Sequence, residues 1–400
     1  MRARQAVAAS MAAAALVAPI ALAGCGDGGG SGPVALRVYV SVPLHGARAA
    51  EGEAIEDGAR LALADAGGRV GRFRIRAVYL DDSDAGGWSI ARTAANARRA
   101  AQDTAAIGYV GDVDSGATKV SLPITNQAEI AQISPASGAV DLTRVSSAGG
   151  SDPDRYRPYD RQSFARVVPD DDLVVRAAAV WAKREGARTF AAGGDRTSFG
   201  KITADAFASQ ARSLGIRPFS PNQSGSRPQN LLRPNRPSPD AVWFGLSTLP
   251  SSSAFEAQLA AQPSSSFIPA AIAEPAFLRG VATVQDQLRL VSAFLDPSLL
   301  PASAKPVLRE FRSRFKRPPP PAAAYGYESM ALLLDAIRRA GDDGDSRAAV
   351  IDALLSTTER RSILGTYSID GNGDTTLDAV SGYRVGDGIP VFPIRLTAPR

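Results

Sequence analysis

The stretch Leu36-Arg37-Val38-Tyr39-Val40-Ser41-Val42 places an apolar residue at every second position, which is typical of a β-strand. Residues 51–66 follow with apolar side chains at helical spacing, and Gly67-Gly68 ends that helix. A second strand is expected over residues 73–80. Strand, helix and strand in this order predict a βαβ unit, in which the two strands run parallel.

The same alternation continues along the chain and predicts an α/β protein with two lobes. A first set adds a helix over 91–102, a strand over 106–111, a helix to about 127 and a strand over 130–134. A second set has a helix over 171–185, a strand over 189–192, a helix over 201–214 and a strand over 241–245. A late helix over 325–340 and hairpin strands within 365–396 complete the pattern.

The N-terminus has the composition of an export signal. Arg2 and Arg4 precede an uncharged, mostly apolar run over residues 6–23, which ends at Leu22-Ala23-Gly24-Cys25. A transmembrane helix is the alternative, but the span is short and dominated by alanine. The last four residues resemble the lipobox of bacterial lipoproteins, which implies cleavage before Cys25 and lipidation of its side chain. We therefore expect a signal peptide over 1–24, a flexible tether over 25–33 and an extracytoplasmic protein that is lipid-anchored to the cell membrane.

The composition of the chain limits the number of domains, the possible disulfides and the class of binding partner. A chain of 400 residues suits two domains better than one, and a single cysteine excludes an intrachain disulfide. The formal net charge of +5 comes mainly from arginines that are interleaved with acidic residues. Because no basic block is interleaved with aromatic residues, we expect no nucleic-acid partner.

Several segments, taken in order, resemble the branched-chain amino-acid receptors of the periplasmic-binding-protein-like family, which are substrate-binding lipoproteins of ABC importers. The resemblance covers nearly the whole chain after the tether. Its segments are 42–46 with Gly52 and 57–59, 107–111 with Ser115, 133–136, 164–171, 195–200, 324–330 and 365–374.

The resemblance implies the type I fold of periplasmic binding proteins: two Rossmann-like lobes with parallel central sheets, joined by three hinge crossings. Lobe one is expected to hold residues 34–165 plus 293–366, and lobe two residues 166–292 plus 367–400. In the family the ligand is enclosed between the lobes. That position agrees with the rule that open α/β sheets bind ligands beyond the carboxyl ends of their strands.

In lobe one, the resemblance assigns the ligand's carboxylate to Ser115, Gly116 and Ala117, ahead of a helix that we expect from about Lys119. Ser115 is alternatively the N-cap of that helix, and both roles are compatible. The ligand's ammonium group would contact the loop with Ala136 and Ser137. There the hydroxyl comes one position early, and Gly138 stands where the family has Thr or Ser.

In lobe two, the matching positions are Phe199, which keeps the family's aromatic ring without its hydroxyl, and Ser247, which replaces a tyrosine. The acid that pairs with the ammonium is missing, and Glu274 is the nearest carboxylate to its position. Glu51 stands at a usual aromatic position in lobe one. Since a buried ammonium without a partner is costly, either Glu274 or Glu51 substitutes, or the ligand is not an α-amino acid.

Catalytic and metal patterns are absent from the sequence. His45 is the only histidine, no Gly-x-Ser-x-Gly motif occurs, and the one cysteine is assigned to the anchor, so neither a hydrolase triad nor a zinc site is expected. Residues 370–374 resemble the start of a calcium loop but lack its later ligands, so we expect a hairpin turn. The run Asp81-Asp82-Ser83-Asp84 is interpreted as a solvated strand end.

The sequence therefore predicts a non-enzymatic solute-binding protein without cofactor or metal. It would capture a small polar ligand, an amino acid or a related carboxylate or amide, and deliver it to an ABC permease in the membrane. A ligand sensor of the same fold, which presents its ligand to a membrane receptor or kinase, is the alternative. An anchored hydrolase is a third possibility, which the missing catalytic motifs disfavour.

Overall fold

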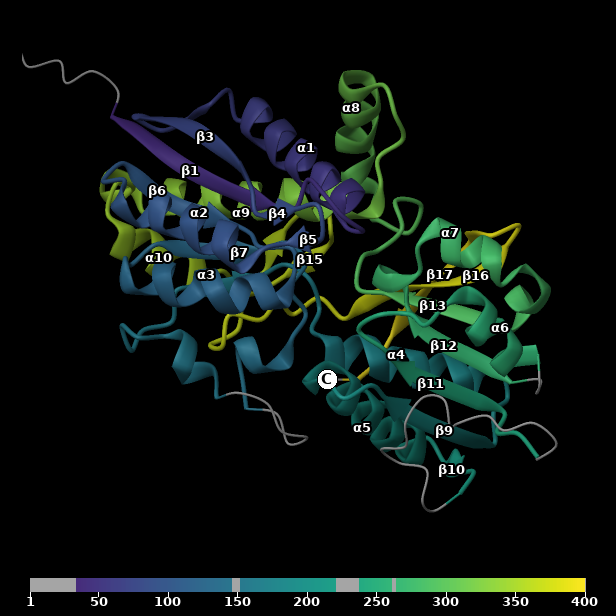
Figure 1. Cartoon of the computed structure of the whole chain (residues 1–400). Coiled ribbons are helices and arrows are strands. Elements are labelled where there is room, and N and C mark those ends of the chain that lie inside the picture. Colours follow the sequence, from purple (N-terminus) through teal and green to yellow (C-terminus); the bar gives the residue numbers. More distant parts are fainter. Residues whose placement is uncertain (1–33, 146–151, 221–236, 261–263, 400) are drawn as a thin grey trace, which may run out of the picture. The chain divides into compact units, whose positions relative to one another are not determined.

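The computed structural model describes residues 34–145, 152–220, 237–260 and 264–399 (Figure 1). The expected signal peptide, the tether and Cys25 lie outside these residues. Within the described ranges, no helix is long and apolar enough to cross a membrane. All described residues fall within one compact unit.

The opening strand lies inside a six-stranded sheet, the first sheet, with the order β2-β3-β1-β6-β7-β8. All neighbours pair in parallel except β2 and β3, so the predicted parallel sheet carries one antiparallel edge strand. The strands are β1 Ala35–Val42, β2 Arg69–Val70, β3 Phe73–Asp81, β6 Ala106–Val110, β7 Ala131–Ser134 and β8 Phe164–Arg166.

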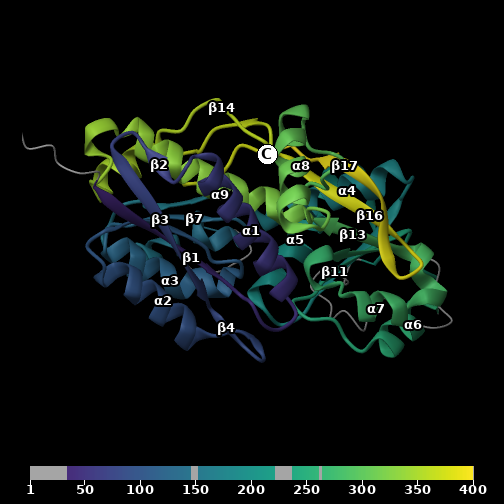
Figure 2. The same ribbon diagram turned by 90° about the horizontal axis from the view of Figure 1, so that it is seen from above.

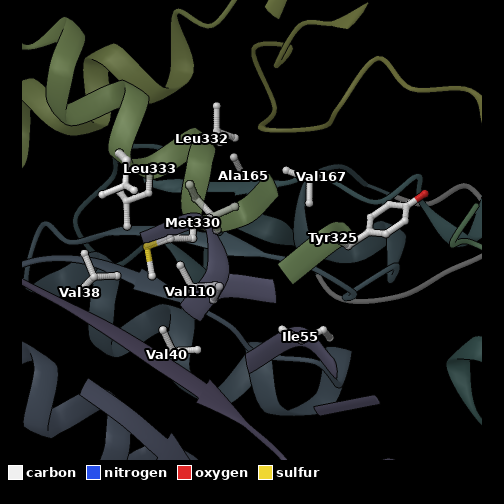
Figure 3. Close-up of a cluster of buried hydrophobic side chains, with 14 of the residues drawn as sticks. Val38, Val40, Ile55, Val110, Ala165, Val167, Tyr325, Met330, Leu332 and Leu333 are labelled. Atoms are coloured by element: carbon white, nitrogen blue, oxygen red, sulfur yellow. The ribbon is translucent and has the colours of Figure 1, made fainter. Parts of the chain in front are cut away.

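Successive side chains of β1 point to opposite faces of this sheet, and each face is covered by different helices. Val38 and Val40 pack into the main core with Val110, Met330 and Leu333 (Figure 3). Tyr39 points to the opposite face, where its cluster includes residues of α2 and β6. Helices α1, α9 and α10 thus contribute to one face of the sheet, and α2 contributes to the other. The helices around the first sheet are α1 Ala49–Asp65, α2 Ile90–Gln102, α3 Ser115–Gln127, α8 Lys305–Phe315, α9 Pro321–Arg339 and α10 Arg347–Leu355.

Helices α1 and α9 lie side by side although they are far apart in sequence (Figure 2). Glycines allow this close approach. A Cβ on Gly58 would stand 2.1 Å from the carbonyl oxygen of Ala323, and one on Gly326 would stand 2.1 Å from that of Ile55. Any other residue at either position would push the two helices apart.

The second sheet has seven strands in the order β10-β9-β11-β12-β13-β16-β17. The strands up to β13 are parallel, and β16 and β17 are antiparallel, as the expected C-terminal hairpin requires. The strands are β9 Thr189–Gly194, β10 Arg217–Pro218, β11 Ala241–Gly245, β12 Ser265–Pro269, β13 Leu288–Ser292, β16 Ala379–Gly386 and β17 Ile389–Thr397.

Two helices contribute to each face of the second sheet. Trp243 and Phe267 pack with α4 and α5, whereas Val242 and Phe244 pack with α6 and α7. The helices are α4 Asp171–Arg184, α5 Ser198–Ser213, α6 Ser252–Ala260 and α7 Pro275–Gly280. Helix α5 begins three residues before the predicted Lys201, because the Thr197 side chain accepts a hydrogen bond from the N–H of Gly200 and caps it.

Within the described ranges the chain passes between the two sheets three times, as predicted: after β8, after β13 and before β16. Two short ribbons accompany these elements: β4 Ser83–Asp84 with β5 Gly87–Trp88, and β14 Arg360–Arg361 with β15 Thr366–Tyr367. Short 3-10 turns complete the described chain: η1 Val140–Leu142, η2 Pro153–Tyr156, η4 Ala270–Ile272, η5 Ala282–Gln287, η6 Ala302–Ala304 and η7 Gly341–Asp343.

A buried arginine at the first passage between the sheets forms an ion pair with a residue at the third passage. The Arg166 side chain is fully buried, and its Nε donates to Asp374 over 2.7 Å. Its other nitrogens donate to the carbonyl oxygens of Ser137 and Ala139 and to Thr143. Asp374 ends the segment that resembles a calcium loop, which is a tight turn closed by a bridge between residues 369 and 375. Arg166 therefore also holds the loop that follows β7.

Candidate functional site

The three residues assigned to a ligand carboxylate form the first turn of α3. The helix begins at Ser115 rather than near Lys119, and Asp114 occupies the N-cap position, so the N-cap interpretation of Ser115 is wrong. The first helical N–H groups of an α-helix have no intrahelical partner, and they attract anions. The Ser115 hydroxyl accepts a hydrogen bond from the N–H of Ala139 over 3.1 Å, which joins this turn to the loop after β7.

The loop after β7 is built around buried hydroxyl groups. Ser134 and Ser137 both donate to the carbonyl oxygen of Asp112, over 2.7 and 3.1 Å, and Ser137 also pairs with Thr118 over 2.7 Å. Ser137 is fully buried, so its hydroxyl holds the loop, while Ala136 beside it is half-buried. The structure thus brings the first turn of α3 next to the loop of Ala136 and Ser137.

Two buried acids stand behind these loops. Asp112 accepts from the hydroxyls of Tyr109, over 2.9 Å, and Ser121. Asp82 is also fully buried, and neither oxygen of its carboxyl group has a hydrogen-bond partner among the described residues. Burial raises the pKa of both carboxyl groups, and the charge of Asp112 raises that of Asp82 further. The interpretation of residues 81–84 as a solvated strand end is therefore wrong at Asp82 and Ser83.

Glu51 lies in the first turn of α1 and forms an ion triad with Arg48 and Asp114. Arg48 donates from Nε to Glu51 over 3.3 Å, from a second nitrogen to the same carboxylate, and from the third to Asp114 over 2.8 Å. The three side chains are 18–24% exposed. Since Arg48 already compensates its charge, Glu51 is a poor candidate for a ligand ammonium.

Two residues that the sequence analysis did not select lie against the predicted ones. The ring of Trp88 covers Gly116, where a Cβ would stand 2.5 Å from Cζ2. The Asp171 carboxylate lies against Gly138, where a Cβ would stand 2.2 Å from Oδ1, and the Asp171 N–H donates to the Gly138 carbonyl over 2.8 Å. Asp171 thus occupies the space that a side chain at position 138 would need.

Asp171 is a carboxylate that lies directly against the loop after β7. It begins α4 directly after the first passage, and its side chain has no hydrogen bond or ion pair within the described ranges. Burial raises its pKa to about 6, although the nearby Arg166 opposes the shift. The sequence signal was available in the run Asp170-Asp171-Asp172 and in the glycine at 138, but charges at a helix start are usually explained by the helix dipole.

Two of the predicted lobe-two residues, Phe199 and Ser247, follow β9 and β11, which are neighbouring strands. Ser247 donates its N–H to Asp195 over 2.7 Å, and its hydroxyl pairs with Thr197 over the same distance. Phe199, which lies two residues after Thr197, is half-buried in the first turn of α5. Glu274 stands apart: it is the exposed N-cap of the short helix α7. The structure therefore groups Phe199 with Ser247 but gives Glu274 no contact with them.

Other places in the described chain fit a ligand site less well. Two surface hollows of about 530 and 560 Å³ are lined by no predicted ligand residue; they contain Arg37 with Tyr39 and Glu328 with Arg360. Within the described ranges, no group of three or more His, Cys, Asp or Glu side chains is placed to hold a metal ion. His45 is exposed and lies 3.0 Å from Asp81.

Solved structures with this fold come from several solute-binding proteins. A leucine-binding protein, LivK, from Thermotoga maritima is 20% identical, with a TM-score of 0.71, and the match covers 90% of this chain and 99% of that chain. The branched-chain amino acid transporter substrate-binding protein LivJ from Streptococcus pneumoniae, in complex with isoleucine, is 17% identical, with a TM-score of 0.69 and coverage of 91% and 100%. An ABC transporter solute-binding protein from R. palustris, in complex with benzoate, is 18% identical, with a TM-score of 0.66 and coverage of 91% and 97%.

These identities are low, so the structures show the fold alone. No curated protein matches the chain. The model of the family described as periplasmic binding protein matches residues 36–388, which is most of the sequence. The neighbouring structures are substrate-binding proteins of the type I fold, as the resemblance of the segments implied. This chain belongs to the periplasmic binding protein family.

Proposed function

We propose that this protein is the solute-binding component of an ABC importer and captures a small organic carboxylate between its lobes. The observation that carries the proposal is the first turn of α3, where the N–H groups of residues 115–117, which have no intrahelical partner, adjoin the loop held by Ser137. The ligands of the related structures, isoleucine and benzoate, share a carboxylate. A helix N-terminus with an adjacent hydroxyl is suited to bind that group.

If the ligand also carries an ammonium group, we propose Asp171 as its partner, in place of Glu274 or Glu51. Asp171 has a carboxylate without a partner in the described chain and lies against the loop of Ala136 and Gly138. Glu274 is exposed on α7, and Glu51 is paired with Arg48. A ligand such as benzoate would leave Asp171 unused.

The lobe boundaries given above, 34–165 plus 293–366 and 166–292 plus 367–400, remain part of this proposal. Lobe one would supply the carboxylate contacts, and lobe two would add Phe199 and Ser247 when the lobes close on the ligand. Closure biased by contacts to both lobes is the usual hinge mechanism of such proteins. Binding followed by release to the permease requires no catalytic residue.

The location is proposed from the N-terminal sequence and the family. We propose that residues 1–24 are removed and that Cys25 carries the lipid that keeps the protein at the outer face of the membrane. Mass spectrometry of the purified chain should show a new N-terminus at Cys25 with acyl chains attached. In a Cys25→Ser variant the protein should lose the lipid and appear in the soluble fraction. An unmodified Cys25 in the natural host would contradict the anchor.

Thermal unfolding tests the ligand class directly. The full chain, purified in detergent, would be melted with leucine, isoleucine, benzoate, their amides and uncharged sugars. A ligand at one hundred times its dissociation constant stabilises by about 2.7 kcal/mol, which moves the midpoint by several degrees. We expect shifts with carboxylates only. Shifts confined to sugars or amides would refute a carboxylate site.

A further inference from the structure

The ion triad of Arg48, Glu51 and Asp114 adjoins the first turn of α3, which is the proposed carboxylate site. Asp114 immediately precedes the first turn of α3, and Arg48 donates to it over 2.8 Å. Arg48 also occupies the N-cap position of α1, and its other two nitrogens donate to Glu51. Burial alone would lower the pKa of Arg48, but the carboxylates of Glu51 and Asp114 raise it above the ordinary value, so the guanidinium stays charged.

Asp114 creates an electrostatic conflict with the proposed ligand. The N-terminus of α3 favours a negative charge, and Asp114 already places a carboxylate at the N-cap position of this helix. Two carboxylates at the same helix N-terminus repel each other. An unpaired Asp114 would therefore oppose a ligand carboxylate at Ser115 and Gly116.

The loop that carries Arg48 is held rigidly enough to perform this task. Leu44 and His45 both donate their N–H groups to the hydroxyl of Ser83, over 2.9 and 2.8 Å. A Cβ on Gly46 would stand 2.6 Å from the Cα of Gly87, so this part of the loop lies directly on the β4–β5 ribbon. Arg48 therefore reaches Asp114 from a loop fastened at several points.

We propose that Arg48 is a positioning residue of the carboxylate site, which acts by compensating Asp114 so that a ligand carboxylate can occupy the first turn of α3. The proposal rests on the proposed function, since it concerns the same site. Arg48 need not touch the ligand. Its role predicts that removing the charge of Asp114 makes the arginine less important for binding, which a merely structural arginine would not show.

The test compares four forms of the full chain in detergent: the natural protein, Arg48→Leu, Asp114→Asn and the double variant. Binding of leucine and benzoate would be measured by calorimetry at one pH and ionic strength. We expect Arg48→Leu to weaken binding of the carboxylate probe at least about tenfold, the scale of a charge-assisted contact. Asp114→Asn alone should change it less than about threefold, and the double variant should recover part of the loss, since Glu51 still lacks its arginine.

A matched control lies on the same helix. Arg60 pairs with Glu56 on α1 over 2.6 Å and is far from Asp114 in sequence, so Arg60→Leu should leave the affinity unchanged. If the double variant binds as weakly as Arg48→Leu, or if Arg48→Leu binds normally, the positioning role is overturned. If the natural protein binds no carboxylate at all, the proposed function fails first, and this inference falls with it.

Discussion

The loops beyond the first sheet and those beyond the second are held in different ways. In the first sheet, Asp112, Ser134 and Ser137 are fully buried and bond to one another. Beyond the second sheet, the hydroxyl groups of Thr197 and Ser247 form a hydrogen bond at the surface. Since ordering a loop costs free energy on binding, the first set is prepared to receive a ligand and the second is not. We infer that lobe one binds first and that lobe two adds weaker contacts.

The largest effect that separates the two regions concerns their buried arginines. Arg166 is fully buried with Asp374, whereas Arg289 pairs with Glu185, whose side chain is 17% exposed. Removing one partner of a buried ion pair costs about 3–5 kcal/mol, so Arg166→Leu should lower the free energy of unfolding by that amount. Urea denaturation measures this loss. The matched variant Arg289→Leu should lose clearly less, and equal losses would contradict the contrast.

The next effect lies where the two regions meet, at Asp171. For a ligand with an ammonium group, Asp171→Asn should weaken binding by roughly 10- to 100-fold, since a hydrogen bond to a charged group contributes about 1.5–3 kcal/mol. Calorimetry with leucine measures the loss, and benzoate is the control ligand, because it has no ammonium. An equal loss for both ligands would assign Asp171 to the fold rather than to the ammonium.

The same residue predicts a pH dependence. Burial raises the pKa of Asp171 to about 6, so the carboxylate that an ammonium needs is lost as the pH falls through that value. Leucine binding should weaken below pH 6, whereas benzoate binding should change less. Because the folded-state pKa exceeds that of the unfolded chain, ionisation of Asp171 costs stability as the pH rises from about 4 towards 6. A flat leucine profile between pH 5 and pH 7, measured by calorimetry, would exclude this role.

The smallest effects compare single hydroxyls from the two regions. Ser115→Ala removes a hydroxyl from the first turn of α3 and should weaken binding of the carboxylate about 3- to 10-fold, the usual range for one hydrogen bond. Ser247→Ala removes a partly exposed hydroxyl and should change the affinity less than about threefold. Both are measured with the same ligand by calorimetry. If Ser247→Ala has the larger effect, the ranking of the two lobes is reversed.

Much of the fold was predictable because the central strands and their helices carry strong periodicity. Val38, Val40 and Val42 predicted β1 within one residue of its observed start. Ribbons of two-residue strands, such as β4 with β5, carry no periodic signal and were not predicted. The start of α3 was placed too late, although Asp114 is a typical N-cap residue.

The candidate site was less predictable, because its charges depend on tertiary partners. The sequence pointed to residues 115–117, which the structure places together with Ala136 and Ser137. It could not show that Arg48 would pair with Glu51 or that Asp171 would lie against Gly138. Arginines are abundant in this chain, and only folding decides which carboxylate each one meets.

The glycine contact between α1 and α9 has a consequence for how the protein is made. Gly58 and Gly326 come from opposite parts of the chain, so α1 cannot find its partner until most of the polypeptide has been produced. At 5–20 residues per second the delay is on the order of 10–50 s. During that time the apolar side of α1, with Ala54 and Ile55, has no α9 to cover it. We infer that the uncovered side of α1 is a surface to which a chaperone can bind until α9 has been made.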